Sequence, residues 1–140
     1  MLAAAFAACG DDPESAAPID CGLPSPAPRP MAHFVPKVFV IDEAEVVSAQ
    51  RERGGFLASL NVDLGVQDAL TRYRSVVRAA DLEIIQQDNE GFEAEIYVRG
   101  RDRLGAIQIR TSQCTTKSVV FLNVVDPDQL GGGLPSPSPT

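Results

Sequence analysis

Two glutamates with a short, regular spacing are the first candidates for chemistry in this sequence. Glu93 and Glu95 lie in a run that alternates acidic with apolar side chains, so one face of a β-strand would carry both. A strand rises about 3.4 Å per residue, which places the carboxylates roughly 7 Å apart, near the separation used by glycosidases. Pairing with Arg99 or Arg110 across a sheet is the simpler interpretation. We therefore expect no catalysis and keep a small hydrolase that uses surface carboxylates as the alternative.

The sequence contains no motif for other catalytic or cofactor-dependent chemistry. His33 is the only histidine, and it precedes the periodic segments, so we expect it at the surface. There is no Gly-x-Ser-x-Gly sequence, phosphate-binding loop or dinucleotide fingerprint. The cysteines lack the spacing of a zinc site, and the polar residues 88–90 lack that of an EF-hand. We expect no cofactor and no bound metal.

Arginines are the second group with a binding chemistry. Three lie in a predicted helix and three around a predicted turn: Arg72, Arg74, Arg78, Arg99, Arg101 and Arg103. If the two regions face the same way, they form a basic patch for an anionic polymer or lipid headgroups. Local balance by Asp68, Asp81 and Asp102 is the alternative. The net charge of -7 argues against nucleic acid as a partner, because binding phosphate needs a basic surface.

The amino-terminal residues carry a targeting signal. A short apolar run, MLAAAFAAC, is followed directly by Gly10 and acidic residues. Within it, Phe6-Ala7-Ala8-Cys9 resembles the lipobox of bacterial lipoproteins, in which a peptidase cleaves before a cysteine that then receives acyl chains. The resemblance implies that Cys9 is lipidated, that residues 1–8 are the remnant of a signal peptide, and that the protein is extracytoplasmic. Buried acyl chains at about 0.8 kcal/mol per methylene would anchor it to the membrane.

The other two cysteines are candidates for a disulfide. With Cys9 lipidated, only Cys21 and Cys114 remain, and an exported chain reaches an oxidising compartment. A bond between them would join the Pro-rich segment to a turn of the folded domain and favour folding by about 3–5 kcal/mol in the chain-entropy model. Two free thiols are the alternative.

Composition divides the chain into a domain and two tails. Residues 9–30 form a Pro-rich tether that begins with the lipidated cysteine, and residues 126–140 form a disordered Gly/Pro/Ser tail. Most of the negative charge lies in these segments and therefore says little about a binding face. The globular domain is expected over residues 31–125. No apolar stretch approaches the ~18–20 residues of a membrane-spanning helix.

The periodicity of the domain predicts its fold class. Gly54-Gly55 joins two extended runs as a hairpin. A helix then follows from the i, i+3, i+4, i+7 spacing of Val66, Ala69, Leu70, Tyr73, Val76, Val77 and Ala80. Asp68 and Arg72 are spaced for an ion pair on that helix. Four more runs follow, at residues 82–88, 92–99, 107–110 and 119–125. We predict a two-layer α+β domain, with one amphipathic helix packed on an antiparallel sheet in the order β-β-α-β-β-β-β.

The face of the sheet opposite the helix decides what the domain can bind. We expect apolar side chains there, from Leu57, Ile85, Tyr97, Val120, Leu122 and Val124. Residues 33–41, an edge strand or a packed extended segment, would cover this face or leave it open. We interpret the protein as a lipid-anchored extracytoplasmic module of the bacterial cell envelope, with a binding or structural role. An envelope protein or an anionic polymer is the expected partner, and a small extracytoplasmic hydrolase is the alternative.

Overall fold

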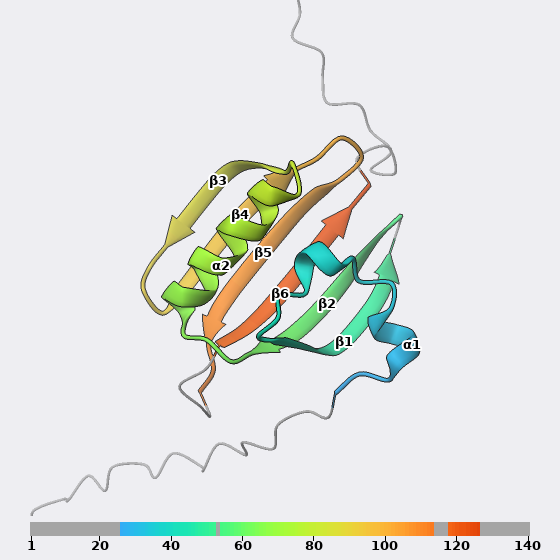
Figure 1. The fold of residues 1–140 in the computed structure, drawn as a ribbon, viewed down its shortest axis with the longest axis horizontal. Coiled ribbons are helices and arrows are strands. Elements are labelled where there is room, and N and C mark those ends of the chain that lie inside the picture. The colour runs from blue at the N-terminus through green and yellow to red at the C-terminus, as the bar shows by residue number, and fades with distance from the viewer. Residues whose placement is uncertain (1–25, 53, 114–117, 127–140) are drawn as a thin grey trace, which may run out of the picture.

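The computed structural model describes residues 26–52, 54–113 and 118–126, and these form one antiparallel sheet with a helical layer on one side (Figure 1). The strands lie in the order β1-β2-β6-β5-β4-β3. This confirms the two-layer α+β fold and its predicted order of elements. The elements are α1 Arg29–Ala32, η1 Lys37–Phe39, β1 Ala44–Glu52, β2 Gly55–Val62, α2 Val66–Ala79, β3 Glu83–Asn89, β4 Glu93–Arg99, β5 Leu104–Thr111 and β6 Ser118–Val125.

Helix α2 forms where the apolar periodicity predicted it and packs over β3, β4 and β5. Its apolar stripe is buried from Val66 to Val77, with Tyr73 fully enclosed and Val76 partly buried, whereas Ala80 is exposed just after the helix ends. The predicted ion pair between Asp68 and Arg72 is wrong. Arg72 instead contacts Asp42 and Glu43, with nitrogen–oxygen distances of 3.4 and 3.2 Å, because the chain before β1 brings both acids to the helix.

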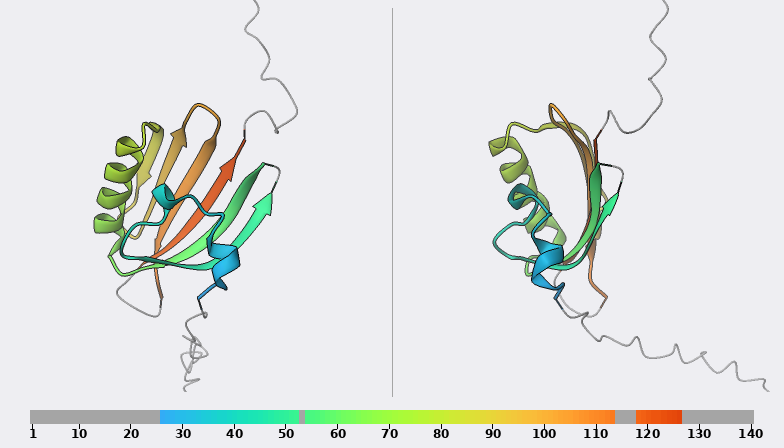
Figure 2. Two further views of the ribbon diagram at one scale, coloured as in Figure 1. Left: turned by 45° about the vertical axis from the view of Figure 1, so that its right-hand side comes forward. Right: turned by 90° about the vertical axis from the view of Figure 1, so that its right-hand side faces the viewer.

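Residues 33–41 form neither an edge strand nor an extended segment. They contain a turn after α1 and the 3-10 helix η1, because Pro36 interrupts any regular strand. The segment lies beside α2 in the helical layer (Figure 2). Phe39 is buried there, with its ring against Phe56 at 5.8 Å, and its carbonyl accepts a 3.1 Å hydrogen bond from the Tyr73 hydroxyl. The segment therefore leaves the opposite face of the sheet uncovered.

The central strand β6 runs between β2 and β5, as its largely apolar sequence indicated. The prediction that Val120, Leu122 and Val124 face away from the helix is wrong. Val120 stands opposite Leu60 in register, and both are buried in the helix-side core. Since side chains alternate along a strand, the opposite face receives Phe121 and the other odd-numbered residues of β6.

Some predictions concern residues outside the described part of the chain. Among them are Cys9, Cys21 and Cys114, the signal remnant and the tail beyond residue 126. Ala27, which belongs to the predicted tether, packs against the domain, and its amide donates a 2.9 Å hydrogen bond to the carbonyl of Val46 on β1. No helix in the described ranges is both long and apolar enough to cross a membrane.

Candidate binding face

The face of the sheet opposite α2, here called the open face, carries no helix of the described residues (Figure 2). The strand registers arrange its side chains in rows that cross all six strands. The first row is Ser48, Ser59, Phe121, Gln108, Glu95 and Asp88. The second row is Gln50, Leu57, Asn123, Ala106, Tyr97 and Gln86.

Two large apolar side chains lie exposed at the centre of this face. Phe121 on β6 is 43% exposed and Leu57 on the adjacent strand β2 is 36% exposed. Both line a shallow hollow of about 560 Å³, together with Ala106, Gln108, Glu95 and, at the margin, Met31 of α1. Ala106 contributes only a methyl group, so β5 adds little bulk at this point. The large apolar side chains at the centre of the hollow therefore come from β2 and β6, where they lie beside Ser59 and Asn123, and Glu95 of β4 is the one charged side chain among the described residues that line it.

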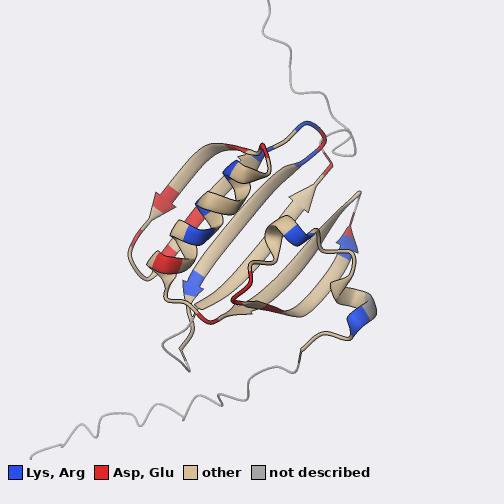
Figure 3. Ribbon diagram, in the orientation of Figure 1, with Lys and Arg blue, Asp and Glu red and all other residues tan. Residues whose placement is uncertain are grey.

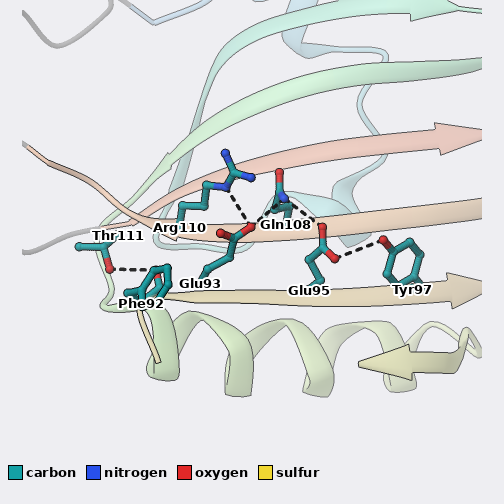
Figure 4. Close-up of polar contacts among 7 residues, drawn as sticks. All are labelled: Phe92, Glu93, Glu95, Tyr97, Gln108, Arg110 and Thr111. Atoms are coloured by element: carbon teal, nitrogen blue, oxygen red, sulfur yellow. Dashed lines mark hydrogen bonds and ion pairs between the residues drawn. The ribbon is translucent and has the colours of Figure 1, made fainter. Parts of the chain in front are cut away.

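A hydrogen-bonded group of side chains lies on β4 and β5 (Figure 4). The Nε2 atom of Gln108 donates to Oε1 of both Glu93 and Glu95, at 2.9 Å each. Arg110 contacts Oε1 of Glu93 at 3.0 Å, which confirms the predicted pairing across the sheet. Because one nitrogen bridges the two carboxylates, their facing oxygens lie closer than the expected ~7 Å.

Glu95 differs from Glu93 in having only neutral partners. Its second oxygen, Oε2, accepts a 3.2 Å hydrogen bond from the Tyr97 hydroxyl. None of the ion pairs among the described residues involves Glu95. The hydrogen bond to Glu95 and the negative charge of this carboxylate raise the pKa of Tyr97, because both favour the protonated phenol.

The hydrolase alternative gains no support from this arrangement. A glycosidase acid and base must flank the bond that is cleaved. Glu93 and Glu95 instead project from the same face of one strand and share Gln108 as a hydrogen-bond donor. The pair can hold a positively charged group, whereas attack from two sides would need a carboxylate from another element.

The six arginines of the predicted patch do not share one face. Those of α2 lie on the helical side, whereas Arg99 alternates with buried Val98 and therefore belongs to the open face (Figure 3). Arg103 contacts Asp102 at 3.2 Å, and this hydrogen bond lowers the pKa of Asp102. Arg74 donates a 2.6 Å hydrogen bond to Gln87. Arg72 is balanced by local acids as well, and binding of an anionic partner to the remaining arginines stays a prediction.

The histidine and the possible metal ligands were the remaining candidates for chemistry. His33 is exposed at the end of α1, as predicted. Within the described residues, no group of three or more His, Cys, Asp or Glu side chains is positioned to hold a metal ion. Comparisons with protein-family models, with curated proteins and with solved structures found no match.

Two residues of the open face were missed by the reasoning from sequence. Phe121 lies in the run 119–125, which is largely apolar on both sides, and Gln108 lies in the run 107–110, where it alternates with isoleucines, so neither pattern indicated a site. Asn123 carried a usable signal, because a polar side chain in a central strand marks the solvent-facing side, and Phe121 is two residues away.

Proposed function

We propose that this protein is a non-catalytic binding module of the bacterial cell envelope, anchored through lipid on Cys9. The lipobox-like Phe6-Ala7-Ala8-Cys9 sequence supports the anchor, and the Pro-rich residues that follow support a tether. A Cys21–Cys114 disulfide would fasten the tether to the turn between β5 and β6. The domain then presents its open face to a protein partner in the envelope.

The proposed binding role rests on the exposure of Phe121 and Leu57 on β6 and β2, two neighbouring strands that lie inside the sheet. Solvated faces of antiparallel sheets are ordinarily polar. Apolar surface costs about 25 cal/mol for each Å² left in water, and these two residues lie in neighbouring strands rather than at a frayed edge. An apolar hollow bordered by hydrogen-bonded polar side chains is the composition expected of a protein-binding surface.

Intact mass spectrometry tests the anchor. The protein should be expressed from its own gene in a bacterial host and measured with and without reductant. We expect loss of all residues before Cys9, a gain of acyl chains, and a mass increase of about 2 Da on reduction of the disulfide. An unprocessed chain with three free thiols would contradict the envelope location. The mass measurement does not test the binding role, which requires a separate experiment that identifies the face in contact with a partner.

A further inference from the structure

Glu95 is a carboxylate beside an apolar surface, and it pairs with no cation among the described residues. It is partly buried, and its oxygens accept hydrogen bonds only from Gln108 and Tyr97 among the described residues. Its neighbour Glu93 is compensated by Arg110. Partial removal of water strengthens the attraction of an uncompensated carboxylate for a positive charge. Among the described carboxylates of the open face, only Glu95 is both partly buried and without an ion pair, so a partner's cation should gain the most binding free energy there.

The geometry sets the distance between this charge and the apolar contact. Phe121, Gln108 and Glu95 stand in one row on β6, β5 and β4. Neighbouring strands lie about 4.8 Å apart, so Phe121 and Glu95 are separated by roughly 10 Å. A Lys or Arg two residues from an apolar side chain in an extended segment can reach both points, because such residues project from the same side.

The charge of the whole open face favours the same kind of partner. Alternation along the strands gives it six carboxylates and two guanidinium groups among the described residues: Glu45, Glu52, Glu83, Asp88, Glu93, Glu95, Arg99 and Arg110. This excess repels an anionic lipid surface. It also repels a second copy docked face to face, which would bring like charges together.

We propose that the open face binds a positively charged protein segment, with Glu95 contacting a Lys or Arg and Phe121 and Leu57 contacting an adjacent apolar side chain. The inference rests on the proposed function and specifies the partner's chemistry. Complementary charge would speed the encounter and select against acidic partners, whereas the apolar contact would supply most of the affinity.

A random peptide display library, selected on the full 140-residue chain, tests the inference without a known partner. Enriched peptides should carry a Lys or Arg close to an apolar residue. Their affinity should fall about tenfold for Glu95→Gln and at least tenfold for Phe121→Thr. Asp68→Asn and Phe92→Thr are matched controls, because Asp68 is exposed on α2, on the other side of the sheet, and Phe92 is exposed in the β3–β4 turn away from the hollow. Circular dichroism and thermal unfolding should show that all four variants are folded.

Different failures of this experiment overturn different claims. Peptides that depend on Phe121 but lack basic residues, or that ignore Glu95→Gln, would overturn the inference and leave a binding face in place. Peptides that bind equally to Phe121→Thr and to wild type would overturn the role of the open face, and with it the proposed function. Failure to enrich any peptide above an unrelated immobilised protein would also count against the inference.

Discussion

The hydroxyl of Tyr97 donates a 3.2 Å hydrogen bond to Oε2 of Glu95, two residues earlier on the same strand. This contact orients the carboxylate on the open face without neutralising it. It also gives the site a spectroscopic reporter, because the chain contains only two tyrosines and the other, Tyr73, belongs to α2 and is buried in the core.

Glu95→Gln should lower the pKa of Tyr97 toward the ordinary value of 10.0. The hydrogen bond to a charged acceptor and the repulsion of phenolate by Glu95 raise this pKa in the wild type, and glutamine removes the charge. Ultraviolet titration of tyrosinate should therefore show an earlier first ionisation in the variant. Asp68→Asn, on the other side of the sheet, should leave the titration unchanged. An unchanged Glu95→Gln profile would mean that the contact does not persist in solution.

Alkaline pH should destabilise the fold through both tyrosines. Burial raises the pKa of Tyr73, and the Glu95 contact raises that of Tyr97. Because the folded state then holds these protons more tightly than the unfolded chain, the stabilisation is complete below about pH 10 and is lost as pH rises through the folded-state values. Urea unfolding across this range should show a falling free energy of unfolding above pH 10. A free energy of unfolding that stayed level or rose there would contradict the burial of Tyr73.

Tyr73→Phe should lower the free energy of unfolding by about 1–2 kcal/mol. It removes the hydroxyl that donates to the carbonyl of buried Phe39, leaving that acceptor without this partner. Urea denaturation provides the measurement, and Tyr97→Phe on the more exposed face serves as the comparison, with a smaller expected effect. Equal losses for the two variants would indicate that α2 and η1 do not pack as described.

Phe121 and Leu122 are adjacent residues on opposite faces, so their substitution should have very different effects on stability. Leu122 is 1% exposed, and Leu122→Ala should cost about 2–5 kcal/mol because it opens a cavity in the core. Phe121→Thr should cost less than about 1 kcal/mol, since Phe121 is 43% exposed and lies outside the buried core, and threonine suits a strand. Chemical unfolding of both variants would test the register of β6, and the reverse order of effects would contradict it.

Periodicity predicted the elements better than the direction in which residues face. The stripe from Val66 to Val77 identified α2, and the alternation of Phe92–Val98 identified β4. In β6 both faces are largely apolar, so alternation offered only Asn123 as a guide and the inward face was misassigned. The path of residues 33–41 had no period to follow, because packing against Tyr73 and Phe56 determines it.

The candidate site was only partly accessible to the same reasoning. Glu93, Glu95 and the pairing with Arg110 follow from spacing on a strand and from pairing across a hairpin. The bridging role of Gln108 depends on the register between β4 and β5. The turn between these strands sets that register, and the sequence placed the ends of the turn only to within several residues. The contact of Arg72 with Asp42 and Glu43 likewise required the tertiary path before β1.

Photo-crosslinking in intact bacterial cells tests most directly whether the open face meets a partner. The full chain would carry a benzophenone amino acid at exposed Asn123 on the open face or, as the matched position, at exposed Ser75 on α2. We expect a protein adduct from Asn123 that is lost when Phe121→Thr is added, and none from Ser75. Adducts from Ser75 alone, or adducts from Asn123 that persist with Phe121→Thr, would contradict binding through the open face.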